Sequence, residues 1–96
     1  MPTLELPIAA DHPALAGHFP GRPIVPGVVL LDQAQRHIEA HCGRRCTALA
    51  MAKFSSPATP EDRLTLDFTP QDVVVRFEIR SGTRLIASGR FSLASA

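Results

Sequence analysis

The chain has 96 residues and a formal net charge of +1 at pH 7, with 45% hydrophobic and 20% charged residues. This balance indicates one globular domain over residues 1–96 with a modest core, without a signature of disorder. The near-neutral charge, with five phenylalanines as the only aromatic residues, argues against nucleic-acid binding, which uses basic surfaces and stacking platforms. No apolar run approaches the roughly 20 residues of a membrane span. Residues 1–13 lack the basic start and apolar core of a secretory signal, so we expect a cytoplasmic protein.

The N-terminal half predicts one strand and one helix. Apolar and polar residues alternate over residues 3–8, which predicts a half-buried strand, and Pro7 favours an edge position for it. The composition suits a helix over about residues 28–42, and Gly43 is well suited to end it. Because residues 28–31 are apolar all round, we expect this first part of the helix to be buried on every side.

Four strands are expected after the helix, at residues 47–54, 64–68, 73–79 and 85–93. Ser81 and Gly82 form a turn signal between the last two strands. Small alternating residues in the first of these strands, the alanines at 48, 50 and 52, predict close packing against the helix. The economical arrangement is an α+β fold, an antiparallel sheet of about five strands wrapped around one central helix.

Two cysteines, Cys42 and Cys46, lie four residues apart, and His37 and His41 precede them. Together these side chains would supply two nitrogen and two sulfur ligands for a zinc ion. The spacing fits no common zinc pattern, and Gly43 is expected to end the helix between the cysteines. We therefore expect two ordinary thiols, with no metal and no cofactor.

The most informative stretch spans residues 18–32 and reads HFPGRPIVPGVVLLD. Its three prolines fix the backbone and remove donors, so no regular helix begins before Pro26. The stretch therefore reads as a stiff loop carrying His18, a helix start at Gly27, and a buried acid at Asp32. A histidine and a carboxylate directed at one apolar place suit acid–base chemistry. Taken singly, His18 could simply fill the loop, and Asp32 could bond to a buried backbone group.

This stretch resembles the 3-hydroxyacyl-acyl-carrier-protein dehydratases, which have the hotdog fold, a sheet wrapped around one central helix. The resemblance rests on an ordered set of residues: His18-Phe19-Pro20-Gly21, Pro23, Pro26-Gly27-Val28, and an acid fourteen residues after the histidine. It extends over nearly the whole chain, through Asp11-His12-Pro13, Gly17, Lys53-Phe54, Pro57, Pro60, Asp62 and Ala87-Ser88-Gly89.

The sequence also departs from the family pattern. The chain is short for the family, and we expect clipped loops and the lack of an N-terminal helical segment. The acid at position 32 is aspartate, as in one branch, where the other branch has glutamate. Glu61 precedes Asp62 where a glycine is usual, and Arg36 stands where the family often has glutamine.

The resemblance implies loss of water from a (3R)-3-hydroxyacyl thioester to give the trans-2-enoyl thioester. It makes His18 the base that removes the proton next to the thioester carbonyl. Asp32 then serves the leaving hydroxyl, and the backbone N–H of Gly27 donates to the thioester oxygen. The residues expected to line the apolar substrate tunnel are Phe19, Val25, Val28, Leu31 and Phe54.

The resemblance also implies two partners. The substrate is carried by an acyl carrier protein, which is acidic, so we expect a basic docking surface formed by Arg22, Arg36, Arg44 and Arg45, with Lys53 behind it. The second partner is another copy of the chain, because in the family one protomer gives the histidine and the other gives the acid. A homodimer would also cover the sheet edges of so small a sheet.

Two other functions remain open at this level. Hotdog proteins also include acyl thioesterases, in which the acid would activate water, although these do not generally carry the His18 motif. The short chain and Arg36 also suit a non-catalytic dehydratase-like subunit that binds an acyl carrier protein or pairs with a larger homologue. For the dehydratase, we expect a role in fatty-acid synthesis or a related lipid or polyene pathway.

Overall fold

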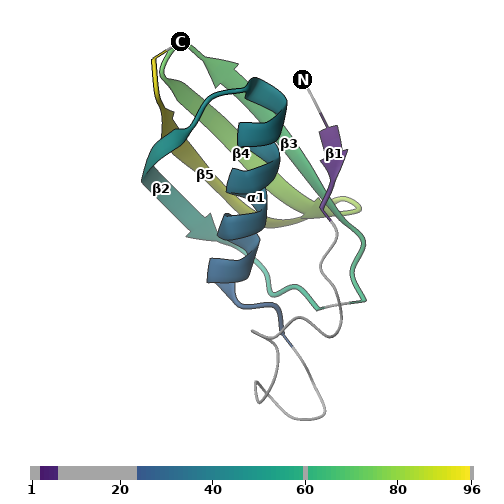
Figure 1. Ribbon diagram of the computed structural model, residues 1–96. Helices are drawn as coiled ribbons and strands as arrows, with labels where there is room; N and C mark the ends of the chain where they lie inside the picture. The colour runs from purple at the N-terminus through teal and green to yellow at the C-terminus, as the bar shows by residue number, and fades with distance from the viewer. Residues whose placement is uncertain (1–2, 7–23, 60, 96) are drawn as a thin grey trace.

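The computed structural model describes residues 3–6, 24–59 and 61–95. These residues form one helix and five strands (Figure 1): β1 (Thr3–Glu5), α1 (Gly27–Cys42), β2 (Cys46–Phe54), β3 (Leu64–Gln71), β4 (Val74–Ser81) and β5 (Arg84–Leu93). The number and order of these elements confirm the arrangement predicted from the sequence. His18, Phe19 and Arg22 lie outside the described residues.

All five strands form one antiparallel sheet in the order β1-β3-β4-β5-β2. The expected edge position of the first strand is confirmed, because β1 pairs only with β3. That pairing ends at Thr3 and Asp67, so the rest of β3 has a free side among the described residues. Pro70 lies in this free part, opposite Val75, where a missing N–H removes no hydrogen bond between strands.

Two tight turns connect β3, β4 and β5. Gly82, with φ of 61°, forms the turn predicted after Ser81. The other turn was missed, because Val73 was assigned to a strand and instead lies in the turn with Asp72, whose φ is 50°. Aspartate tolerates this left-handed conformation better than most residues, and Val73 is left 43% exposed.

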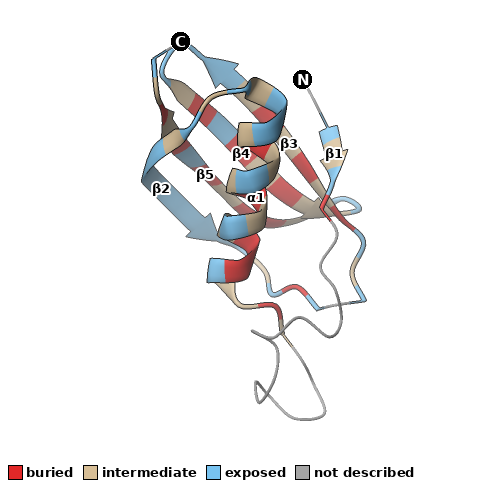
Figure 2. Ribbon diagram, viewed as in Figure 1, coloured by how far each residue is buried: buried red, intermediate tan, exposed pale blue. Residues whose placement is uncertain are grey.

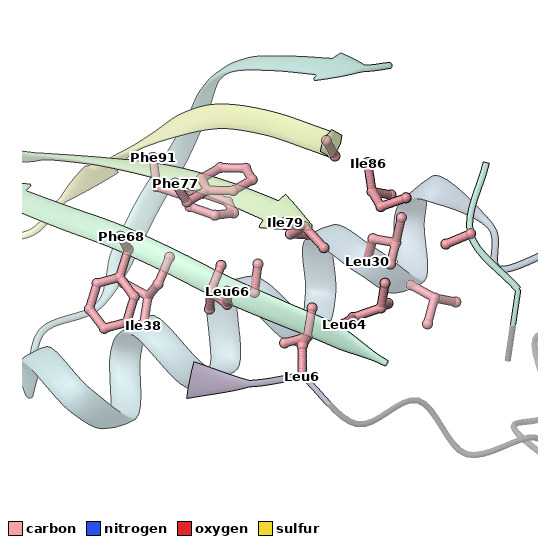
Figure 3. Close-up of a cluster of buried hydrophobic side chains, with 14 of the residues drawn as sticks. Leu6, Leu30, Ile38, Leu64, Leu66, Phe68, Phe77, Ile79, Ile86 and Phe91 are labelled. Atoms are coloured by element: carbon pink, nitrogen blue, oxygen red, sulfur yellow. The ribbon is translucent and has the colours of Figure 1, made fainter. Parts of the chain in front are cut away.

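The hydrophobic core lies between α1 and the face of the sheet formed by β3, β4 and β5 (Figures 2 and 3). Alternate residues of β3, of β4 and of β5 from Ala87 onward are buried, as the sequence pattern predicted. The pattern breaks at the start of β5, where Ile86 and Ala87 are both buried beside an irregularity in the pairing with β4. The rings of Phe77 and Phe91 stack with their centroids 5.0 Å apart. From α1, the residues that enter the core are Val29, Leu30, Ala34 and Ile38.

The helix begins and ends close to the predicted residues. Pro26 is the N-cap and makes no side-chain cap bond, and Gly43 has a left-handed φ of 67° and donates its N–H to the carbonyl of Glu39. The expectation that residues 28–31 are buried on every side is wrong. Val28 is 72% exposed, because one face of α1 packs on the sheet and the opposite face is uncovered.

Strand β2 is the second edge of the sheet, and its residues 47–54 are all exposed (Figure 2). The expectation that its alanines pack closely on the helix is therefore wrong. Irregularities in the pairing with β5, between Cys46 and Ala48 and between Leu49 and Met51, interrupt the simple alternation. Both faces of the strand are exposed, so that Leu49 and Met51 are each 44% exposed.

Candidate active site

The site predicted from the sequence centres on the start of α1. The carbonyl of Pro26 accepts hydrogen bonds from Val29, at 3.0 Å, and from Leu30, at 3.3 Å. The N–H groups of Gly27 and Val28 precede the first helical hydrogen bonds, and no described residue accepts a hydrogen bond from either. Unpaired N–H groups and the positive end of the helix dipole favour an oxyanion at this position.

A hollow of about 420 Å³ lies against this helix start. It is lined by Val25, Gly27, Leu30, Phe54 and the loop Ser55, Ser56, Pro57 and Ala58. Three residues predicted for the site, Val25, Gly27 and Phe54, are thus brought together. A Cβ atom added at Gly27 would lie 2.7 Å from the Phe54 ring, so the ring packs directly on the helix start, and any side chain at position 27 would have to displace it.

The predicted acid, Asp32, is not buried. Its side chain is 49% exposed on the uncovered face of α1, and its Oδ2 accepts a hydrogen bond from Nε of Arg36 at 3.0 Å. The two residues lie one helical turn apart, on the same face as Val28. Asp32, Val28 and Leu31 do not line the hollow. Within one chain, the acid and the Gly27 site therefore lie on different surfaces.

The arginines predicted for carrier docking do not form one patch in the described chain. Arg36 pairs with Asp32, as above, and Nε of Arg44 donates to the carbonyl of Ala94 at 2.8 Å. Arg45 is exposed. Arg44 and Arg45 follow the C-terminal end of α1, and a helix of 16 residues spans about 24 Å. Both arginines therefore lie one helix length away from Gly27.

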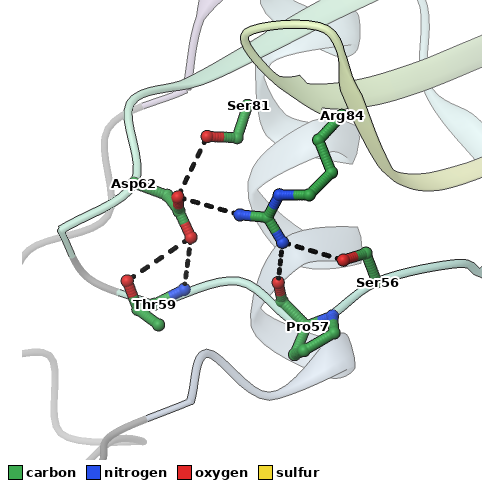
Figure 4. A network of polar contacts seen from close by, with 6 residues as sticks. All are labelled: Ser56, Pro57, Thr59, Asp62, Ser81 and Arg84. Carbon is green, nitrogen blue, oxygen red and sulfur yellow. Dashed lines mark hydrogen bonds and ion pairs between the residues drawn. The ribbon is translucent and has the colours of Figure 1, made fainter.

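The loop after β2 was missed as part of the site. Ser55, Ser56 and Ala58 were not singled out from the sequence, although they line the hollow. The proline that follows the two serines was a usable signal, because a stiff turn directly after Phe54 has to pass close to the helix start. A network of polar contacts around Asp62 and Arg84 holds this loop (Figure 4).

The cysteines show no feature of a reactive or metal-binding pair. Both are partly buried and pack against the core. Burial, with smaller contributions from the charge of Glu39 and from Cys42, raises the pKa of the Cys46 thiol to about 11. The described residues contain no group of three or more His, Cys, Asp or Glu side chains arranged to hold a metal ion.

A second hollow, of about 560 Å³, lies over the sheet face opposite α1. Its lining includes Asp67, Glu78 and Ser88, which are neighbours across β3, β4 and β5. It contains none of the residues predicted for the site. The hollow beside Gly27 is therefore the one that matches the chemistry predicted from the sequence. Separately, no helix in the described chain has the length and apolar character needed to cross a membrane.

Comparison with known proteins decides the family. A family model for the ApeI-like dehydratases, described as ApeI dehydratase, matches residues 2–90. The chain belongs to this family. The predicted membership of a dehydratase family is thereby confirmed.

Curated relatives support the same assignment. The chain is similar to the 3-hydroxyacyl-acyl-carrier-protein dehydratase FabZ of Allorhizobium ampelinum, with 32% identity over 73 residues, which is 67% of this chain and 47% of the relative. A Wolbachia FabZ is 33% identical over 75 residues, covering 69% of this chain and 52% of the relative. The aligned segment thus spans about half the length of the curated relatives.

Solved structures confirm the hotdog fold. The dehydratase heterocomplex ApeI:P from Xenorhabdus doucetiae contains a chain that matches with a TM-score of 0.82 at 22% identity, covering 96% of this chain and 85% of that chain. An uncharacterized protein from Erwinia carotovora subsp. atroseptica matches with a TM-score of 0.75 at 26% identity, covering 97% and 80%.

Proposed function

We propose that this protein dehydrates a (3R)-3-hydroxyacyl thioester, carried on an acyl carrier protein, to the trans-2-enoyl thioester. The observation that supports this most is the hollow beside Gly27, a helix-start residue whose N–H has no hydrogen-bond acceptor among the described residues, and which shares the hollow with the apolar side chains of Val25, Leu30 and Phe54. Family membership supports the same reaction class. We place the reaction in fatty-acid synthesis or a related lipid or polyene pathway.

In the proposed reaction, His18 removes the proton on the carbon next to the thioester carbonyl. Negative charge then develops on the carbonyl oxygen, and the Gly27 N–H stabilises it. One such donor is worth about 3 kcal/mol at the transition state. As the double bond forms, the hydroxyl leaves from the next carbon with a proton from Asp32, directly or through water. The proton taken by His18 and the proton given by Asp32 balance, and water is released.

Mass spectrometry of the acyl product tests the proposal directly. The protein is incubated with a 3-hydroxyacyl thioester on an acyl carrier protein, and in parallel with the same thioester on coenzyme A. Loss of one water from the acyl group is the expected result. Release of the free acid would instead indicate a thioesterase, and an unchanged substrate would contradict catalysis by this chain alone.

Two substitutions identify the groups involved. We expect His18→Ala and Asp32→Asn each to lower kcat by at least about a hundredfold, the usual contribution of a general acid or base. Asp72→Asn is the matched control for the second change, because Asp72 is an exposed turn residue whose left-handed backbone suits asparagine. Equal activity of Asp32→Asn and Asp72→Asn would remove Asp32 from the mechanism.

We also propose that the chain acts as a homodimer with sites shared between the protomers. Two observations support this. Asp32 lies away from the hollow in its own chain, so it suits the site of a neighbour. The exposed β2 edge, with Leu49 and Phe54 uncovered, offers a row of backbone groups and apolar side chains to a second copy.

Mixing inactive variants tests the shared site. In a mixed dimer of His18→Ala and Asp32→Asn chains, one site carries both changes and the other carries neither. Because random mixing makes half of the dimers mixed, about a quarter of the wild-type activity should return. No return of activity, although mass measurement shows mixed dimers, would contradict shared sites.

One observation supports a different pairing. The structure that matches the fold with a TM-score of 0.82 is described as a dehydratase heterocomplex. By analogy, this chain would pair with a larger homologue that supplies part of the site, and the ion pair of Arg36 with Asp32 suits a subunit with a reduced catalytic role. Co-expression with neighbouring hotdog genes, followed by mass measurement of the complex, separates this pairing from a homodimer.

Carrier docking and location stay predictions. For docking, Arg22 and Arg36 are the better candidates, because Arg22 is close in sequence to the helix start and the Arg36 side chain is 71% exposed despite its ion pair with Asp32. Arg44 and Arg45 lie at the far end of α1. If charge reversal at Arg22 and Arg36 left turnover of the carrier-bound substrate unchanged, docking at these residues would be contradicted. The cytoplasmic location expected from the sequence is untested.

A further inference from the structure

We propose that Asp62 and Arg84 are positioning residues that hold the loop wall of the hollow against the start of α1. The inference rests on the proposed function, because the loop matters for catalysis only if the hollow binds the thioester. Neither residue lines the hollow. Their side chains bond to the loop that does, and together with Ser81 they form what we call the loop clamp (Figure 4).

Arg84 connects the start of β5 to the loop. Its Nη1 donates to Oγ of Ser56 and to the carbonyl of Pro57, both at 2.8 Å, and its Nη2 donates to Oδ1 of Asp62 at 3.0 Å. Ser56 and Pro57 are lining residues of the hollow. One guanidinium group thus holds Ser56, Pro57 and the carboxylate of Asp62 at the same time, which suits the planar arrangement of its N–H donors.

Asp62 closes the loop on itself and ties it to β4. Its Oδ2 accepts from the backbone N–H of Thr59 at 2.8 Å, and its Oδ1 accepts from Oγ of Ser81 at 3.0 Å. The hydrogen bond from the Thr59 backbone lowers the pKa of Asp62, and Ser81 and Arg84 add to the effect. The carboxylate is therefore ionised and fully engaged at neutral pH, with a side chain only 18% exposed.

The loop is hydrogen-bonded in turn to the segment that leads into α1. Between Pro57 and Thr59 lies Ala58, which is 1% exposed, and its carbonyl accepts a hydrogen bond from the N–H of Val25 at 2.8 Å. Val25 is two residues before Gly27 and lines the same hollow. A chain of direct contacts therefore runs from the clamp, through the loop, to the residues that place the Gly27 N–H.

Arg80 provides a comparison for Arg84, because its ion pairs lie within the sheet and do not involve the loop. Arg80, at the end of β4, lies 3.0 Å from Glu78 and 3.9 Å from Asp67, and no hydrogen bond or ion pair joins these side chains to the described residues of the loop. Arg80 and Arg84 lie on either side of the same turn and are similarly accessible, with side chains 33% and 45% exposed. Arg80→Met is therefore a matched control for Arg84→Met.

Hydrogen exchange tests the clamp without relying on activity. In full-length protein, Arg84→Met should speed exchange of the Val25 amide by about tenfold, because the loop that accepts its hydrogen bond is released. Arg80→Met should leave that amide within about twofold of wild type. Unchanged exchange in Arg84→Met, or equal acceleration in both variants, would overturn the proposal.

Kinetics test the consequence for the reaction. Arg84→Met and Asp62→Asn should each lower kcat about tenfold with little change in KM, because a displaced wall misplaces the carbonyl relative to the Gly27 N–H at the transition state. Arg80→Met should keep both constants. Rates are divided by the concentration of folded protein. The folded fraction is measured by circular dichroism, and the assays are run well below the melting temperature.

The two arms separate the possible failures. If wild-type protein does not dehydrate any thioester, the proposed function is wrong, and hydrogen exchange still decides whether the clamp holds Val25. If wild-type protein is active, but Arg84→Met and Arg80→Met have equal kcat and KM, the positioning role is wrong although the function stands. A fall in kcat confined to the clamp variants, together with faster Val25 exchange, supports both.

Discussion

The two sides of α1 use the same kinds of residue in opposite ways. On the side that packs on the sheet, Ile38, Leu66 and Phe68 are at most 1% exposed. On the other side and on β2, Val28 and Phe54 are 72% and 51% exposed. The first region is a closed hydrophobic core. The second contains apolar residues of the same kinds, but they are exposed to solvent. The difference supports the proposal that apolar residues on the second side serve assembly and substrate binding rather than folding of the single chain.

The largest difference in the free energy of unfolding between the two sides is expected when a phenylalanine on each side is replaced by alanine. Phe68→Ala should lower the free energy of unfolding by about 3–5 kcal/mol, because it leaves a cavity in a closed core. Phe54→Ala, the same change on the uncovered side, should cost less than about 1 kcal/mol in the isolated protomer. Urea unfolding at a dilution that disfavours dimers measures both. Equal losses would mean that the uncovered side is part of the folding core.

The second-largest difference in stability is expected between alanine substitutions of two glycines. A Cβ atom at Gly89 would lie 2.3 Å from the carbonyl oxygen of Met51, so Gly89→Ala has to move β2 away from β5 and should cost about 1–3 kcal/mol. Gly27→Ala meets only the half-exposed ring of Phe54, which is free to turn aside. We expect it to leave the urea midpoint nearly unchanged while lowering kcat. A larger loss of stability from Gly27→Ala than from Gly89→Ala would contradict this assignment.

A smaller effect is expected from the pH dependence of the loop clamp, which joins the two regions. The folded-state pKa of Asp62 lies below its ordinary value of 3.8, so its stabilising effect is fully present above that value. The effect is lost as the pH falls through the lower, folded-state pKa. At neutral pH, Asp62→Asn should therefore melt a few degrees below wild type. Melting curves at decreasing pH should converge, and a constant difference would rule out ionised Asp62 as the source.

The smallest effect on protomer stability is expected at Leu49. Leu49→Lys should change the unfolding free energy of the isolated protomer by no more than about 0.5 kcal/mol, because the side chain is already 44% exposed. It should nevertheless prevent dimer formation, since a charge on an edge strand opposes pairing with another chain. Val73→Lys, equally exposed but in a turn, is the control, and light scattering reads the mass. Dimers of Leu49→Lys would move the interface away from β2.

The sequence predicted the fold well where periodicity and turn residues agreed. The buried faces of β3, β4 and β5 follow from alternation, and Gly43 and Gly82 mark turns that only a left-handed backbone satisfies. The turn at Asp72 was missed because the neighbouring valines continue a strand pattern. Pairing with β4 carries β3 on to Gln71, so the turn begins only at Asp72.

The site was predicted in part, for a physical reason. Gly27, Val25 and Phe54 meet as expected, because a helix start and the following edge strand are brought together by one loop. The exposure of Asp32 and Val28 was not foreseen, since four apolar residues in a row predict burial without showing what buries them. Asp62 was singled out by the family resemblance, but its contact with Arg84 was not predicted, because it joins segments 22 residues apart.

The position of β5 in the sheet has a consequence for how the chain folds. β5 follows every other strand in the sequence, but it lies between β4 and β2 and pairs with both. β2, although made earlier, has no described strand to pair with until residues 84–93 exist. During synthesis, β2 therefore stays unpaired, and the apolar residues of α1 and β2 stay exposed, until β5 has been made. We expect the two hairpins of β3, β4 and β5 to form first, because their contacts are local, and β2 to be added in a slower, late step.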